Sequence, residues 1–176
     1  MTEEIICAGF GGQGIMILGK LMAYSAMRKN FNVTWMPSYG AEVRGGTAHC
    51  MVVISDKEVA SPVISLYDTA IIMNKPSLDK FIGKIRPKGT LILNSSLVDG
   101  KIKRKDISVL RIPFTDIAHK LGNIRVANVI AFGVYMSKKK LFSKEIAKKG
   151  ITIAFGGNKE LVSLNIRALE EGLKVV

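Results

Sequence analysis

Residues 5–14 read Ile-Ile-Cys-Ala-Gly-Phe-Gly-Gly-Gln-Gly, and a second apolar run, Ile-Met-Ile-Leu, follows at 15–18. The first run has the length and composition of a buried parallel strand. Residues 13–28 then place apolar and small side chains on one helical face, namely Ile15, Leu18, Met22, Ser25 and Ala26. Glycines between a strand and a helix let a ligand approach the backbone, and the first N–H groups of the helix attract anions. The stretch therefore predicts the first strand, turn and helix of an α/β unit, with a candidate anion site at the turn.

Three of these glycines, Gly9, Gly11 and Gly14, have the G-x-G-x-x-G spacing of dinucleotide-binding folds. Such folds place an acidic residue about 20 residues further on, where it holds the ribose. Here the predicted second strand, 31–36, is followed by Pro-Ser, and the first acid after it is Glu42 in a loop. A nicotinamide or flavin site is thus disfavoured, and a turn that only allows close packing remains the alternative. The candidate ligand contacts of the turn are Gly9, Gly11, Gly12, Gln13 and Gly14.

The composition is that of one ordinary domain, spanning 1–176, with 48% hydrophobic but only 7% aromatic residues. No apolar run reaches the roughly 18 residues of a membrane helix, and the Thr-Glu-Glu at 2–4 lacks the positive charge of a signal peptide. We therefore expect a cytoplasmic protein that does not enter a membrane. Lysine and arginine outnumber the acids by 26 to 14, but the basic runs carry no interleaved aromatic residues. Solvated surface is the simplest interpretation of these runs, and no nucleic-acid partner is expected.

Cys7 and Cys50 are far apart in the sequence and are expected to be buried, reduced thiols. Two cysteines cannot supply the four thiolates of an iron–sulfur cluster. His49 and His119 have no visible partner that would complete a metal site or a general base, so structural or surface roles are expected and no metal site is predicted.

The remaining pattern alternates strands with helices. Further strands are predicted at 47–55, 68–73, 90–93 and 108–112, with a hairpin from 56–57 into 58–60, and helices at 75–84, from Pro113, and at 126–138, 143–150 and 158–173. This pattern predicts an α/β fold, Rossmann-like and three-layered, with a doubly wound, mainly parallel sheet whose first strand is central. Asn94, Ser95 and Ser96 follow a strand at its carboxyl end, where ligands of such sheets bind, and are secondary candidates.

A second glycine-rich loop, Pro-Ser-Tyr-Gly-Ala-Glu-Val-Arg-Gly-Gly at 37–46, carries side chains that turn chemistry does not select. An internal Glu42–Arg44 ion pair is one explanation, and a ligand or partner contact is the other. We expect this loop to lie beside the first turn, so that Arg44 offers a planar cation to a phosphate or to a partner's carboxylate. The candidates here are Ser38, Tyr39, Glu42, Arg44, Gly45, Gly46 and Thr47.

Within the predicted helix at 126–138, Asn128 is the one polar residue of an apolar run. It could bridge groups within the core, or contact a ligand or a neighbouring subunit. Gly133 weakens the same helix by about 1 kcal/mol relative to alanine, which close packing would explain.

Four segments together resemble the gamma subunit of the 2-oxoacid:ferredoxin oxidoreductases, the pyruvate/ketoisovalerate family. They are the glycine turn at 9–14, Trp-Met-Pro-Ser-Tyr-Gly-Ala-Glu-Val-Arg-Gly-Gly-Thr at 35–47, Met-Asn-Lys-Pro-Ser-Leu-Asp-Lys-Phe at 73–81, and Arg-Val-Ala-Asn at 125–128. The second segment is similar to the 2-oxoglutarate and branched-chain branch. Ala41 and His49 stand where relatives often have proline and asparagine, which bears on the substrate and not on the family.

The resemblance implies a complex that converts a 2-oxoacid, coenzyme A and oxidised ferredoxin into an acyl-CoA, carbon dioxide and reduced ferredoxin. It implies that thiamine diphosphate, Mg²⁺ and the iron–sulfur clusters sit on partner subunits of the alpha, beta and delta types. This chain would hold no cofactor tightly, would perform no chemistry alone, and would help to admit or bind coenzyme A. A homodimer of the isolated chain is compatible with this role.

The alternative is a stand-alone Rossmann-like module that binds a free nucleotide at the glycine turn. Co-purification with further subunits at fixed stoichiometry would favour the oxidoreductase, whereas a monomer that binds adenine nucleotide tightly would favour the module.

Overall fold

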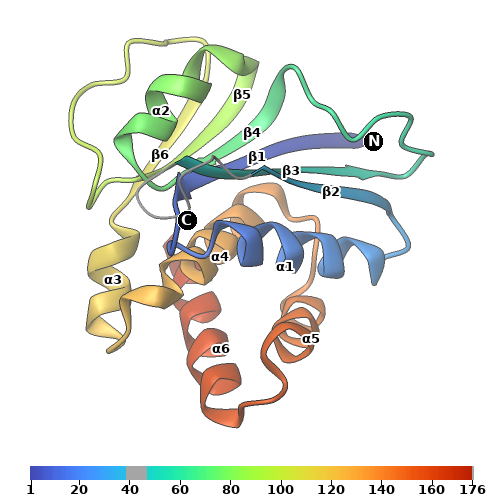
Figure 1. The fold of residues 1–176 in the computed structure, drawn as a ribbon, viewed down its shortest axis with the longest axis vertical. Coiled ribbons are helices and arrows are strands. Elements are labelled where there is room, and N and C mark those ends of the chain that lie inside the picture. Colours follow the sequence, from blue (N-terminus) through green and yellow to red (C-terminus); the bar gives the residue numbers. More distant parts are fainter. Residues whose placement is uncertain (39–46, 176) are drawn as a thin grey trace.

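The computed structural model describes residues 1–38 and 47–175. Its centre is one six-stranded sheet in the order β2-β3-β1-β4-β5-β6 (Figure 1). The strands are β1 (Thr2–Phe10), β2 (Asn32–Ser38), β3 (Thr47–Ser55), β4 (Tyr67–Ile72), β5 (Ile85–Asn94) and β6 (Ser108–Ile112). Neighbouring strands run parallel from β1 through β6, whereas β3 runs antiparallel to both of its neighbours. The expected mainly parallel α/β sheet with a central first strand is confirmed.

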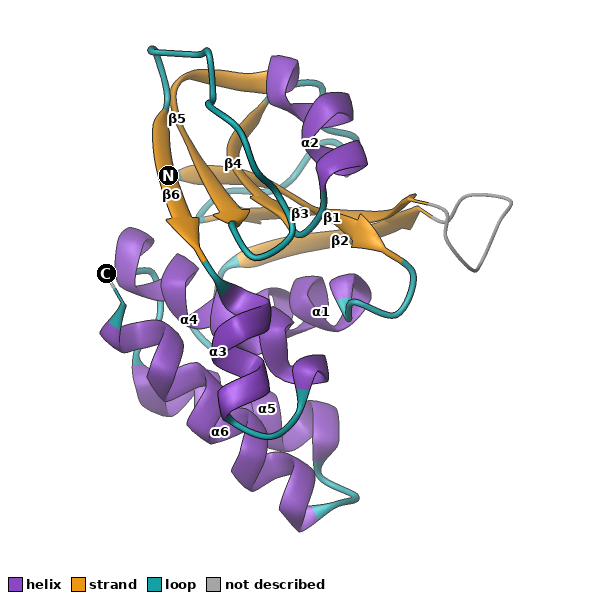
Figure 2. Ribbon diagram, turned by 90° about the vertical axis from the view of Figure 1, so that its left-hand side faces the viewer, coloured by secondary structure: helices purple, strands orange, loops and turns teal. Residues whose placement is uncertain are grey.

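The helices cover the two faces of the sheet unequally. They are α1 (Ile15–Met27), α2 (Lys75–Phe81), α3 (Phe114–Lys120), α4 (Ala127–Lys139), α5 (Lys144–Phe155) and α6 (Lys159–Lys174), with short 3₁₀ turns η1 (Ile82–Lys84) and η2 (Ile124–Val126). Figure 2 shows α1, α4, α5 and α6 below the sheet and α2 above it. The apolar run of β1 serves both faces: Ile5 and Cys7 join the larger core on the α1 side, and Ile6 and Ala8 join the smaller core under α2. The fold therefore has three layers.

Two expectations about the first part of the chain were wrong. Pro37 does not end the second strand, because β2 continues to Ser38 and pairs Pro37 with Cys50 of β3. An edge strand tolerates a proline, whose missing N–H would otherwise interrupt a ladder. The hairpin into 58–60 is also absent, because those residues form no strand and β3 instead pairs with β1 and β2.

The helical part of the chain follows the predicted pattern, with two corrections. Ser143 accepts the N–H of Ile146 and caps α5 as expected, but α5 continues past Gly150 to Phe155. A Cβ at Gly150 would lie 3.2 Å from the Ser25 hydroxyl, so this glycine allows α5 to approach α1 and does not end the helix. The sequence pattern also predicts Leu161 on the apolar face of α6, but Leu161 is 40% exposed, and the buried residues of this helix are Asn165, Ala168, Leu169 and Gly172.

The two cysteines are separated by 43 positions in sequence but are direct neighbours across the β1–β3 ladder. Both are free and fully buried, as expected. A side-chain hydrogen bond with Cys50 and burial raise the pKa of the Cys7 thiol well above its ordinary value. The Cys7 thiol therefore stays protonated at neutral pH, and both buried sulfurs pack within the core.

Helices α4 and α6 approach each other closely at Gly133 and Gly172. A Cβ at Gly133 would lie 2.5 Å from the Leu169 carbonyl oxygen and 2.9 Å from the Gly172 Cα, both of which are backbone atoms. The structure therefore confirms the expectation that close packing explains the glycine at this position of the helix.

We expect Gly133→Ala to destabilise the protein by about 1–3 kcal/mol, because backbone atoms must move to accept the methyl group. Intrinsic helix propensity alone would favour the alanine by about 1 kcal/mol, so a loss of stability isolates the packing effect. Urea unfolding measures the change. The matched control is Gly83→Ala in η1, where an added Cβ meets nothing within 4 Å and no loss is expected. Equal stability of the two variants would contradict the packing account.

Ion pairs also join helices α5 and α6. Glu170 of α6 accepts Lys144 at 2.8 Å and Lys148 at 3.0 Å, both from α5, and these hydrogen bonds lower its pKa to about 2. The unfolded carboxyl titrates near pH 4.3. The stabilisation is therefore complete above about pH 4.3 and is lost as the pH falls toward 2.

Glu170→Gln should accordingly flatten the decline in unfolding free energy between about pH 5 and pH 2. Chemical unfolding at a series of pH values measures this slope. Glu160→Gln, at an exposed position of the same helix, should leave the slope unchanged. The ion-pair account fails if both variants keep the wild-type decline.

Candidate functional site

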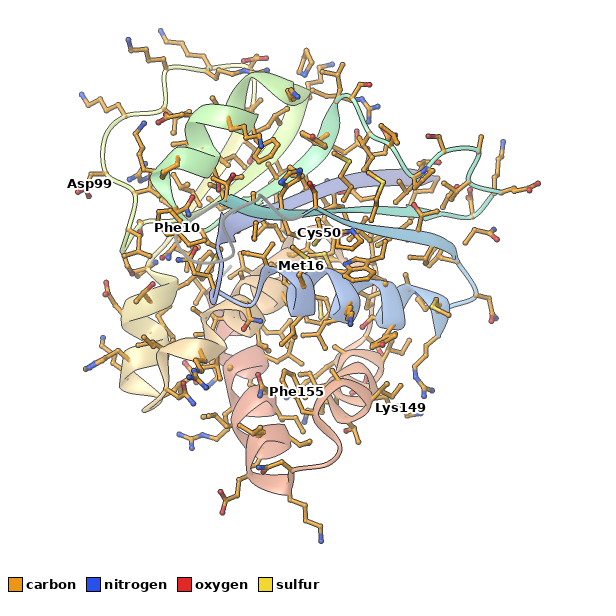
Figure 3. The ribbon with its side chains drawn as sticks, viewed as in Figure 1. Phe10, Met16, Cys50, Asp99, Lys149 and Phe155 are labelled. Carbon is orange, nitrogen blue, oxygen red and sulfur yellow. The ribbon has the colours of Figure 1, made fainter. Side chains whose placement is uncertain are left out.

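The glycine turn connects β1 to α1 within four residues. Gly12 and Gly14 have φ values of 93° and 71°, a left-handed conformation that side-chain-bearing residues adopt at a cost. Gly14 is also the N-cap of α1, and its carbonyl accepts the first helical hydrogen bond, from Leu18 at 2.9 Å. The turn leaves Phe10 37% exposed, and Figure 3 shows Phe10 where β1 passes into this turn. The sequence correctly located the strand, the turn and the helix.

The side chain of Gln13 closes the turn. Its Oε1 accepts the Phe10 N–H at 2.7 Å, and its Nε2 donates to the Met73 carbonyl at the end of β4 at 3.4 Å. A Cβ at Gly9 would lie 2.5 Å from this Oε1, so glycine is required there to make room for Gln13. Gln13 and Gly9 thus have structural roles, and their contact with a ligand stays a prediction, as does that of the exposed Gly11.

Asn128 fastens the turn to α4. The side chain is 2% exposed, and its Nδ2 donates to the Gly14 carbonyl at 2.9 Å. A Cβ at Gly14 would lie 2.3 Å from the same nitrogen, so a side chain there would displace the amide. Of the alternatives open for Asn128, the structure places it as a bridge within the fold. Its buried Oδ1 has no partner within the described residues.

A crevice of about 350 Å³ opens beside the turn, at the carboxyl edge of β1 and β4. Its walls combine the turn, the end of β4, the segment after β5, and the starts of α3 and α4. The lining residues are Gly12, Gln13, Met73, Leu97, Thr115, Ile124, Arg125 and Ala127. Leu97 and Ile124 are 47% and 59% exposed, so the crevice has an apolar rim.

The electrostatics of the crevice favour an anion. α1 begins here, and it has neither an acidic residue in its first turn nor a capping side chain, so the partial positive charge of its N-terminus is uncompensated by the chain. α4 also has no acidic residue in its first turn, but it continues from η2, where the Asn123 side chain accepts the Arg125 N–H. Arg125 adds a full positive charge, and no Asp or Glu belongs to the lining within the described residues.

Arg125 is part of the Arg-Val-Ala-Asn motif but was not among the predicted site residues, and neither was Thr115. One signal was available for Arg125: a cation just before a helix N-terminus is repelled by the helix dipole, so a bound anion would explain its position. Thr115 gave no signal. It lines the crevice because β6 returns the chain to this edge, and its hydroxyl accepts Asn94 Nδ2 at 3.0 Å.

The secondary candidates at the end of β5, Asn94 and Ser96, form hydrogen bonds within the fold. Asn94 is fully buried and also donates to the Met73 carbonyl at 3.3 Å, and the Ser96 hydroxyl accepts the N–H of Asp116 at 3.2 Å. These bonds fix β5 and α3 around the crevice.

The two described ends of the second glycine-rich loop, Ser38 and Thr47, lie at this edge of the sheet. The ladder pairs Thr47 with Phe10 of β1 and Ser38 with His49 of β3, so both ends lie near the end of β1. The crevice lining within the described residues includes neither Ser38 nor Thr47. Five further candidates lie outside the described residues: Tyr39, Glu42, Arg44, Gly45 and Gly46.

His49 of β3 packs against an aromatic ring. His49 lies 5.0 Å from the Phe81 ring, and burial, with the charges of Lys80 and Lys84, lowers its pKa. Within residues 1–38 and 47–175, no three His, Cys, Asp or Glu side chains are grouped to hold a metal ion. No helix of this part is both long enough and apolar enough to cross a membrane.

Known proteins with similar sequences support one family. The family model described as "Pyruvate ferredoxin/flavodoxin oxidoreductase" matches residues 4–175. The ketoisovalerate oxidoreductase subunit VorA of Methanothermobacter marburgensis is 34% identical over 94% of this chain. The chain spans only 34% of that relative's length. The 2-oxoglutarate synthase subunit KorC of Methanocaldococcus jannaschii is 31% identical, and the match covers 99% of this chain and 94% of KorC.

Solved structures share the fold. The gamma subunit of a keto/oxoacid ferredoxin oxidoreductase from Geobacter sulfurreducens matches with a TM-score of 0.84 and 27% identity, over 98% of this chain and 96% of that one. A 2-oxoglutarate:ferredoxin oxidoreductase from Magnetococcus marinus matches with a TM-score of 0.90 over 98% of this chain and 30% of that one, but at 22% identity it supports the fold alone. From the family match and the KorC alignment, the chain belongs to the pyruvate ferredoxin/flavodoxin oxidoreductase family.

Proposed function

We propose that this chain is the gamma-type subunit of a 2-oxoacid:ferredoxin oxidoreductase. The complex would convert a 2-oxoacid, coenzyme A and oxidised ferredoxin into an acyl-CoA, carbon dioxide and reduced ferredoxin. The family match and the nearly full-length similarity to KorC support this assignment. The names of VorA and KorC favour a branched-chain 2-oxoacid or 2-oxoglutarate as the substrate.

The chemical step belongs to partner subunits in this proposal. Thiamine diphosphate with Mg²⁺ supplies the carbanion equivalent, and iron–sulfur clusters accept the electrons. Two cysteines, both committed to the core, leave this chain without ligands for a cluster. Partners of the alpha, beta and delta types would therefore carry the cofactors, and this chain would position a substrate.

We propose coenzyme A as that substrate, and the crevice beside the glycine turn is the observation that carries the idea. The uncapped N-terminus of α1 and the Arg125 side chain lie at a crevice of about 350 Å³ whose described lining contains no carboxylate. Coenzyme A carries a diphosphate and a 3′-phosphate, which suit such a site. The volume is at the small end for ligand pockets, so it suits one phosphate-bearing part of the molecule. Arg44, outside the described residues, would be the second cation.

The fold weighs against a stand-alone dinucleotide module. In dinucleotide-binding folds the second strand lies next to the first and presents an acid to the ribose. Here β3 is inserted antiparallel between β1 and β2, which moves the end of β2 one strand further from the glycine turn. The last residue of β2 is Ser38, which is not an acid.

Replacing Arg125 by alanine tests the coenzyme A proposal in the assembled complex. We expect the KM for coenzyme A to rise by about tenfold or more, since a hydrogen bond to a charged group contributes about 1.5–3 kcal/mol. Decarboxylation of the 2-oxoacid without coenzyme A should be unchanged. The readout is the coenzyme A dependence of ferredoxin reduction.

The matched control is Arg167→Ala on α6, an exposed arginine that lines a different groove. It should leave the KM for coenzyme A unchanged. If Arg125→Ala also leaves this KM unchanged, the crevice does not bind coenzyme A. If it instead releases the partner subunits and lowers both half-reactions together, Arg125 docks a subunit.

A further inference from the structure

A second positively charged surface lies on the α2 side of the sheet. It consists of Lys80, Lys84, Lys88, Lys103 and Lys105, which we call the basic face. All five residues are exposed. Lys88 lies in the amino-terminal half of β5, and Lys103 and Lys105 lie in the neighbouring segment before β6. The glycine turn lies at the opposite, carboxyl edge of the parallel strands. The basic face is therefore separate from the crevice.

Specific bonds hold the two segments of the basic face together. The Arg104 guanidinium donates to the carbonyls of Ile82 at 2.9 Å and Ile85 at 2.7 Å. The Lys88 N–H donates to the Asp106 carbonyl at 2.6 Å. The segment that carries Lys103 and Lys105 is thus fixed beside the one that carries Lys84 and Lys88. The backbone that carries these lysines is therefore held in place by the fold.

Four of the nearby carboxylates are engaged with other cations. Asp106 pairs with Arg104, and both Glu4 and Asp68 pair with Arg86. Asp79 pairs with Lys75. Within the described residues, none of the five lysines of the basic face belongs to an ion pair, so their charge is available to a partner.

Two further observations agree with a strong local positive potential. Burial lowers the pKa of His49, and the charges of Lys80 and Lys84 lower it further, so their field reaches the sheet. Lys88 lies within β5 and has a φ of 65°, the left-handed region in which glycine or asparagine would be less strained. A charged side chain therefore occupies this position of the strand despite a backbone cost.

The chemistry of the face indicates the kind of partner. Lysine ammonium groups are strongly hydrated and flexible, which suits wet, reversible and salt-sensitive contacts. The neighbouring aromatic rings, Phe81 and Tyr67, are 2% and 1% exposed, so they cannot stack on nucleic-acid bases. An acidic protein surface fits these properties better than a nucleic acid.

We propose that the basic face reversibly docks a small, carboxylate-rich electron-carrier protein. The choice of an electron carrier rests on the proposed function, whose electron acceptor is the one mobile protein in the reaction. Weak, electrostatically guided encounters are typical of such carriers. The inference assigns to this subunit a contact with the acceptor that is distinct from the coenzyme A crevice.

The test measures binding of an acidic [4Fe–4S] ferredoxin to the isolated full-length chain by fluorescence anisotropy, at low and at near-physiological ionic strength. The basic-face variant carries Lys84→Glu, Lys88→Glu and Lys103→Glu. The matched control carries Lys29→Glu, Lys149→Glu and Lys159→Glu, which give the same net charge at exposed positions. Figure 3 places Lys149 on α5, across the sheet from the segment that carries Asp99.

We expect the basic-face variant to bind ferredoxin on the order of ten- to a hundredfold more weakly at low salt, with a shallower salt dependence. The control should bind within about twofold of wild type. Equal weakening in both variants would overturn the proposal, because net charge alone would explain it. Retained ferredoxin binding with selective loss of duplex DNA or anionic vesicle binding would also overturn it. Assembly with the thiamine-binding subunits is measured separately, so that its failure counts against the proposed function alone.

Discussion

The turn from Phe10 to Gly14 is the constraint on which the rest of the structure depends. It must leave the central strand and start a helix within four residues, and it does so with two left-handed glycines. Gln13 then ties the turn to the end of β4, and Asn128 ties the Gly14 carbonyl to α4. These two side chains join segments that are 60 and 114 positions apart. The crevice exists because the turn is held open between them.

The same kind of bond holds the walls of the crevice in place. The amides of Gln13, Asn94 and Asn128 all bond to backbone carbonyls around it, so the walls are fixed by the fold. The N-terminus of α1 is left without a capping side chain at this edge. A phosphate would supply the negative charge that this N-terminus lacks. The geometry therefore suits a chain that presents a substrate to chemistry performed elsewhere.

Local patterns predicted most of the fold. The bounds of β3 and β6, the capping role of Ser143 and the start of α1 all follow from short-range rules. The errors have non-local causes: Pro37 is tolerated because β2 is an edge strand, and Gly150 continues α5 because α1 packs against it. For the site, the turn was visible in the sequence, but the role of Gln13 depends on Met73 and the position of Arg125 depends on α4. Tyr39, Glu42 and Arg44 remain predictions.

The central claim is that this chain contributes coenzyme A binding to a complex without catalysing the reaction alone. Reconstitution tests it most directly: 2-oxoacid- and coenzyme A-dependent ferredoxin reduction is measured for the pure chain, for the partner subunits, and for both together. We predict no turnover by the pure chain, and full activity with a low KM for coenzyme A only when the chain joins its partners. Turnover by the pure chain, or full coenzyme A-dependent activity of the partners without it, would contradict the account.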